Sequence, residues 1–125
     1  MRLTKDAKRN KDLALEIIEY LQQRDMFHDV RLYLNNKCYS SEKGINTQRI
    51  GKTQFGKYYI EDDVDVRGYF RYCNVETVSM SFEGPLYAAL NCGDGRVAAE
   101  INKIASKYGL YFELGQAWNL AFYKV

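Results

Sequence analysis

Residues 94–125, DGRVAAEINKIASKYGLYFELGQAWNLAFYKV, decide the fold that the sequence predicts. The first half predicts a helix, because apolar residues recur at helical spacing between Asp94, a good N-cap residue, and Gly109, which is placed to end it. From Phe112 onward large apolar residues alternate with small or polar ones, which is typical of a β-strand. We expect the large side chains to face the core: Phe112, Leu114, Trp118, Leu120 and Phe122.

The alternating stretch is longer than an ordinary strand of five or six residues, so a break is expected within it. Gln116 interrupts the apolar parity beside Gly115, where a bulge or bend is the natural repair. The sequence therefore predicts a long C-terminal strand that is bent or split near Gly115.

An N-terminal helix is predicted between Thr4 or Asn10, either of which can cap it, and Asp25. Residues 29–40 predict a hairpin, because Asn35-Asn36 tolerates the positive φ angles of a tight turn. The helix carries one apolar stripe, formed by Leu13, Ile17, Ile18 and Leu21.

The middle of the chain predicts a second hairpin over residues 58–73 and a strand over residues 77–82. Residues 84–91 are interpreted as a short helix with Pro85 at its first position, and a strand is the alternative. Residues 42–57 carry three glycines and four cations without a core pattern, and they are expected to form a basic loop.

These elements predict one α+β domain over residues 1–125. An antiparallel sheet of hairpins is packed by an N-terminal and a C-terminal helix and closed by the long C-terminal strand. Residues 1–5 are expected to fray, because the cations that follow oppose the helix dipole.

The net charge is only +2, but it is unevenly distributed along the chain. Residues 1–60 carry 12 Lys/Arg against 7 Asp/Glu, whereas residues 61–125 carry 6 against 9. Such a split predicts a basic binding face or self-association of opposite patches, including a homodimer; the alternative is an ordinary solvated surface.

The cysteines Cys38, Cys73 and Cys92 are odd in number and have no CxxC spacing, which predicts reduced thiols and a cytoplasmic location. The N-terminus has no signal-peptide pattern, and no apolar run approaches the roughly 18 residues that span a membrane, so no membrane partner is expected.

No cofactor and no metal site are expected, because His28 is the only histidine and the cysteines are scattered. Gly93-x-Gly95-x-x-Ala98 matches a dinucleotide fingerprint, but the chain is too short for the fold that this motif requires. A weak anion site formed by Gly93, Gly95 and Arg96 at the helix N-terminus stays a prediction.

Catalysis is not expected, because the sequence contains no local catalytic cluster. An enzyme acting on a small substrate remains an alternative hypothesis, and it would require a deep pocket holding Asp63, Asp65 or Cys92. The acidic residues have a simpler interpretation as a solvated strand edge.

Two sets of binding residues are predicted. The acidic set is suited to occupying the nucleic-acid groove of a protein partner, and it comprises Glu61, Asp62, Asp63 and Asp65. The basic and aromatic set is suited to a protein interface or to stacking on single-stranded nucleic acid, and it comprises Lys43, Arg49, Lys52, Lys57, Tyr58, Arg67, Tyr69 and Arg71.

The stretches TVSMSFEGPLY at 77–87 and KYGLYFEL at 107–114 resemble small accessory proteins of bacterial mobile elements and phages. The resemblance covers about a third of the chain. Proteins of this kind often inhibit host defence systems stoichiometrically, as the anti-CRISPR proteins do. The resemblance implies a non-catalytic protein-binding module, with a nucleic-acid-processing complex as its partner; a nucleic-acid-binding accessory protein is the alternative.

Overall fold

Seven strands form a single antiparallel sheet in the computed structural model of the chain, which describes residues 4–125. The strand order is β3-β4-β2-β1-β5-β7-β6, so β1 and β5 are central and β3 and β6 are the edges. The elements in chain order are α1 (Lys5–Gln23), β1 (Val30–Leu34), β2 (Lys37–Ser40), β3 (Arg49–Thr53), β4 (Gly56–Asp62), the 3-10 helix η1 (Val66–Gly68), β5 (Ser79–Phe82), α2 (Gly84–Cys92), α3 (Arg96–Ser106), β6 (Leu110–Leu114) and β7 (Asn119–Lys124). The predicted α+β class with an antiparallel sheet is confirmed.

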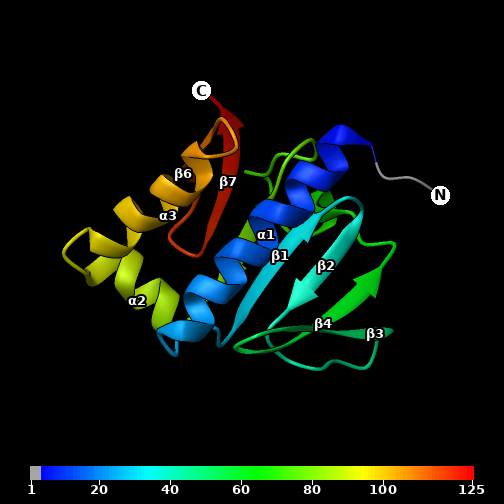
Figure 1. Ribbon diagram of the computed structural model, residues 1–125. Helices are drawn as coiled ribbons and strands as arrows, with labels where there is room; N and C mark the ends of the chain where they lie inside the picture. Colours follow the sequence, from blue (N-terminus) through cyan, green and yellow to red (C-terminus); the bar gives the residue numbers. More distant parts are fainter. Residues whose placement is uncertain (1–3) are drawn as a thin grey trace.

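Helix α1 lies across one face of the sheet, with α3 at its side (Figure 1). Thr4 caps α1 as expected, because its hydroxyl accepts a hydrogen bond from the Ala7 amide at 3.0 Å. The predicted stripe is fully buried under the helix: Leu13, Ile17, Ile18 and Leu21. The fraying predicted for residues 1–5 falls mainly on residues 1–3, which lie outside the described residues, while Lys5 is already helical.

The first hairpin forms as predicted, with Asn35 and Asn36 at φ angles of 51° and 62° in the turn between β1 and β2. Pro85 lies in the first turn of α2, which confirms the helical alternative for this segment. Strand β5 places Met80 and Phe82 in the core, as its alternation predicted.

The C-terminal stretch is split at Gly115, as expected. In place of one long strand it forms two strands, β6 and β7, which pair as an antiparallel hairpin. Leu120 and Phe122 are buried in the core as predicted, but Leu114 is 43% exposed because β6 is an edge strand. Trp118 was also assigned wrongly to this core. It precedes β7 and packs against Phe70 on the opposite face of the sheet, with the ring centroids 5.7 Å apart.

Two further predictions were wrong. The expected loop over residues 42–57 contains β3 and the start of β4. Strand β3 has no apolar pattern because it is an edge strand, and its Gly51 lies against the ring of Tyr58. The hairpin predicted over residues 58–73 is absent: β4 pairs with β2 and β3, and residues 63–78 run irregularly apart from η1.

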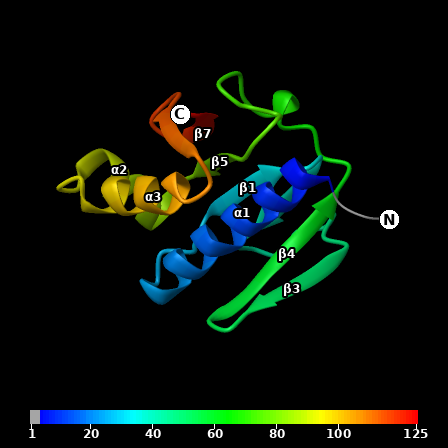
Figure 2. The ribbon, with the colours of Figure 1, turned by 45° about the horizontal axis from the view of Figure 1, so that its top comes forward.

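Residues 63–78 cover part of the sheet face opposite α1. They contribute Val64, Val66 and Phe70 to a second, smaller core that also contains Tyr33 and Cys38. The sheet therefore has a helical layer on one face and irregular chain on the other, as the tilted view in Figure 2 shows.

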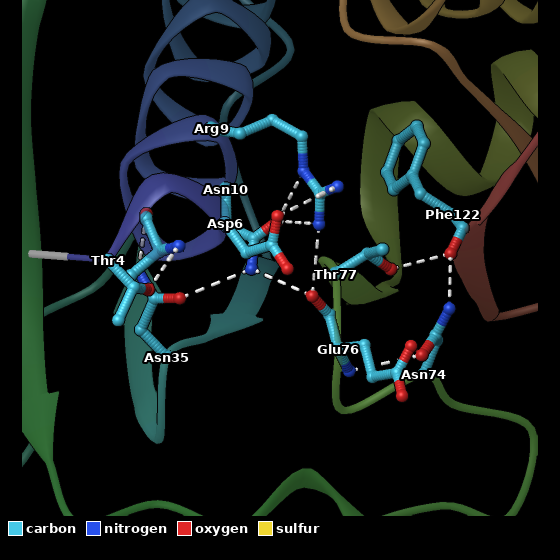
Figure 3. Close-up of polar contacts among 10 residues, drawn as sticks. Thr4, Asp6, Arg9, Asn10, Asn35, Asn74, Glu76, Thr77 and Phe122 are labelled. Atoms are coloured by element: carbon cyan, nitrogen blue, oxygen red, sulfur yellow. Dashed lines mark hydrogen bonds and ion pairs between the residues drawn. The ribbon is translucent and has the colours of Figure 1, made fainter.

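A buried asparagine ties this irregular segment to α1 (Figure 3). Asn10 is only 3% exposed, and its amide donates to the Glu76 carbonyl at 3.0 Å and to the Asn35 side chain at 3.2 Å. Asn74 and Thr77 in turn donate to the Phe122 carbonyl of β7. One network thus joins α1, the β1–β2 turn, residues 74–77 and β7.

Replacement of Asn10 by alanine is expected to lower the free energy of unfolding by about 1–3 kcal/mol, because buried polar groups lose their partners. Urea denaturation measures this loss. Asn46→Ala is the matched control: Asn46 is exposed, and its replacement should change stability by no more than about 0.5 kcal/mol. Equal effects of the two substitutions would show that the network does not stabilise the fold.

Candidate binding groove

A groove lies on the sheet face opposite α1, between two irregular segments. Residues 63–78 border it on one side, and residues 41–48, which connect β2 to β3, border it on the other. The groove is built from two cavities of about 370 Å³ and about 180 Å³. Both cavities are lined by Arg31, Ser40, Glu42 and Tyr69, and we call the joined space the Arg31 groove.

Strand β1 positions the floor of the groove. Val30, Leu32 and Leu34 point to the main core, so the alternating Arg31 and Tyr33 point to the opposite face. The Tyr33 hydroxyl lies 3.3 Å from the Ser81 hydroxyl. Arg31 is exposed and has no ion-pair partner among residues 4–125.

Aromatic rings form the wall on the side of residues 63–78. Tyr69 is 52% exposed, and its ring centroid lies 5.5 Å from that of Tyr33. Phe70 and Trp118 continue this wall along the larger cavity. An exposed tyrosine held by a buried ring offers a rigid contact surface, because little side-chain freedom is lost when a partner binds.

Carboxylates surround this centre. Asp29, Glu42 and Glu83 line the larger cavity, and Glu61 joins Glu42 in the smaller one. Glu42 is held in place by the Asp29 amide, which donates to its carboxylate at 3.0 Å. The groove thus presents one guanidinium among four carboxylates.

Cys38 lies beneath the groove and is buried. Burial raises the pKa of its thiol to about 12, so the reactive thiolate is scarce at neutral pH. The other cysteines, Cys73 and Cys92, are also free thiols.

The predicted acidic residues are only partly grouped, because Glu61, Asp62 and Asp63 line one cavity of about 370 Å³ and Asp65 lies outside it. Asp62 accepts hydrogen bonds from Lys37, at 2.8 Å, and from Arg49, while Asp65 is bound by Arg67. The Lys37 ammonium and then the Arg49 guanidinium hold the pKa of Asp62 below its usual range. Two of the four carboxylates are thus neutralised within the molecule, Asp63 is exposed, and Glu61 belongs to the Arg31 groove.

The predicted basic and aromatic residues are also dispersed. Tyr58 is buried against Tyr39 and Gly51, so it is not accessible to a ligand, whereas Tyr69 is. Lys52 lies directly opposite Lys57 on the β3–β4 hairpin. Lys43 and Arg71 are exposed in the two irregular segments.

At the start of α3, where an anion site was predicted, the chain itself engages one backbone amide. Gly95 has a φ of 87° at the N-cap position, and the Arg96 amide donates to the Asp94 carboxylate at 3.0 Å. The Asp94 carboxylate thus uses one of the donors that a bound anion would need.

Sequence reasoning did not select Arg31 or Trp118 as binding residues. The signal for Arg31 is its position between Val30 and Leu32, because a cation that alternates with core residues must point away from the core. Trp118 offered no comparable signal, since it shares its parity with Leu120 and Phe122.

Within residues 4–125, no group of three or more His, Cys, Asp and Glu side chains is placed to hold a metal ion. No helix in this part of the chain has both the length and the apolar character needed to cross a membrane.

Comparison of the chain with protein-family models, curated proteins and solved structures gave no match. The function is therefore inferred from the geometry of the chain itself.

The Asp62 ion pairs predict a pH-dependent stability. A carboxyl whose folded pKa is lowered stabilises the fold above its unfolded pKa of about 4, and this contribution is lost as the pH falls through the folded pKa. The melting temperature of Asp62→Asn should therefore lie below that of the unmodified protein at pH 7, and the difference should shrink as the pH falls below the unfolded pKa of about 4.

Asp63→Asn is the control for thermal unfolding across this pH range. Asp63 has a φ of 57°, which asparagine also tolerates, and no ion-pair partner in residues 4–125. A constant difference between Asp62→Asn and the unmodified protein at all pH values would exclude the ion pairs as its cause.

Proposed function

We propose that this protein is a non-catalytic binding module that docks on another protein through the Arg31 groove. The observation that carries this proposal is the exposed Arg31, which has no ion-pair partner within residues 4–125, on a floor walled by Tyr69 and Trp118. Arginine, tyrosine and tryptophan are the residues that most often dominate the binding energy of protein interfaces.

The charges of the groove favour a protein over a nucleic acid as the ligand. A phosphate backbone would approach Arg31 past Glu42 and Glu61, and like charges at an interface suppress binding. A protein surface that combines basic side chains with a single carboxylate is complementary to both the carboxylates and Arg31.

We extend this to the mode of action that the resemblance implies. A stoichiometric inhibitor needs a contact surface and no catalytic group. Because proteins that bind nucleic acids expose basic surfaces, a nucleic-acid-processing complex of a bacterial host offers the charge complement of the groove. Occupation of such a surface by this chain would exclude the nucleic acid from it.

Affinity purification with the tagged full chain tests the docking surface. The unmodified chain should retain a stoichiometric partner from host lysate through size-exclusion chromatography. The double substitution Arg31→Ser with Tyr69→Ser should weaken the purified complex at least about 30-fold, because a dominant interface residue contributes about 2 kcal/mol or more.

Tyr87→Ser is the matched control, since Tyr87 is an exposed tyrosine on α2 and does not line the Arg31 groove. It should leave the affinity unchanged. A partner that binds the double variant as tightly as the unmodified chain would refute docking through the groove.

A further inference from the structure

The two edges of the sheet are treated differently by the chain. At the β6 edge, the Phe112 amide donates to the Asn102 side chain of α3 at 2.9 Å, so this edge is partly closed. At the opposite edge, β3 pairs only with β4 within the described residues. Figure 2 shows β3 at the outer margin of the sheet, with no segment of residues 4–125 beside it.

The backbone of β3 is available for pairing. Gln54 and Phe55 form a two-residue turn between Thr53 and Gly56, which are register partners. Hydrogen-bonded and non-hydrogen-bonded pairs alternate along an antiparallel ladder. Counting from this turn, the N–H and C=O groups of Ile50 and Lys52 point away from β4.

The side chains of the same two residues are also unusual for a strand edge. Ile50 is 54% exposed on the same side of the hairpin as Lys52. Lys52 lies directly opposite Lys57, and neither lysine has an ion-pair partner in residues 4–125. Like charges directly opposite in a ladder destabilise it, and a single edge lysine would already discourage aggregation.

We propose that the β3 edge accepts an added strand from a partner protein, an extended segment with an acidic side chain beside Lys52 and an apolar one beside Ile50. In this mode main-chain hydrogen bonds supply affinity, and alternate side chains supply specificity. The acidic side chain would relieve the repulsion between Lys52 and Lys57. The partner strand therefore carries the pattern acidic, any residue, apolar.

A nucleic acid fits this edge less well. Phosphates would meet the two lysines, but they would also face the outward carbonyl groups of Ile50 and Lys52, which repel anions. The exposed side chain of Phe55, in the turn that follows β3, adds apolar surface that suits a polypeptide. Since none of the residues of β3 lines the Arg31 groove, the strand-addition site is independent of the proposed docking groove.

Solution NMR of the full chain with two capped eight-residue peptides tests the proposal. One probe alternates glutamate with valine, and the other replaces every glutamate by lysine. The glutamate peptide should bind at least about 10-fold more tightly, because the charge contact is worth over about 1.4 kcal/mol. At equal peptide concentration, amide exchange of Ile50 and Lys52 should slow more with the glutamate peptide than with the lysine peptide.

Two variants separate the charge contact from the backbone contact. Lys52→Glu combined with Lys57→Glu should reverse the preference between the peptides. Ile50→Pro removes one outward N–H without removing a β3–β4 bond, because proline is tolerated at a strand edge, and it should weaken both peptides. Lys103→Glu, an exposed lysine on α3, is the control and should change neither affinity.

Three results would overturn the proposal. The first is equal affinity for the two peptides, and the second is exchange protection elsewhere without protection at Ile50 and Lys52. The third is binding of a single-stranded oligonucleotide that depends on Lys52 and Lys57 and competes with the glutamate peptide without protecting these amides. That result would assign the edge to nucleic acid.

Discussion

Burial of the α1 stripe against the central strands is the interaction on which the rest of the structure depends. Leu13, Ile17, Ile18 and Leu21 are fully buried, and each contributes about 1.5–3 kcal/mol. The same layer contains Leu32 of β1 and Met80 of β5, which lie at the centre of the sheet. Helix α3 joins this layer through the fully buried side chains of Ile101 and Ala105. Polar contacts to α1 add to this packing: Tyr20 donates to Glu100 at 2.8 Å, and Tyr108, just after α3, donates to Glu16 at 2.7 Å. The helices therefore cover one face, and the other face is left to irregular chain.

This asymmetry explains why a groove exists. Irregular backbone carries polar groups that must find partners, and residues 74–77 satisfy theirs through Asn10, Ser79 and the Phe122 carbonyl. Irregular chain of this kind covers only part of the sheet face. The core beneath residues 63–78 is therefore small, and the sheet beside it is left uncovered at Arg31.

The fold could be predicted where one pattern decided a segment. The α1 stripe, the Asn35-Asn36 turn and the break at Gly115 each have a physical signature within a few residues. Edge strand β3 could not be recognised from the sequence, because it lacks an alternating apolar pattern. At Gly51 the core contact comes from the ring of Tyr58 on the neighbouring strand, and Gly51 has no side chain of its own. Trp118 could not be placed, because only the fold shows that residues 63–78 bring Phe70 to it. Among the predicted site residues, Tyr69 and Glu61 line the groove, whereas the pairing of Asp62 with Arg49 depends on strand register, which the sequence alone does not reveal.

Ion pairs partly offset the uneven charge of the sequence. Several ion pairs join the basic first half to the acidic second half, among them Lys37 with Asp62 and Arg24 with Glu100. Exposed pairs of this kind add little stability, but they remove charge from the surface that a partner meets. Several cations have no ion-pair partner within residues 4–125, and three of them lie at the two proposed binding surfaces. Arg31 lies in the groove, and Lys52 and Lys57 lie at the open edge of the sheet. Because each position also carries exposed aromatic or apolar groups, charge and apolar surface coincide at both, as they do in protein interfaces.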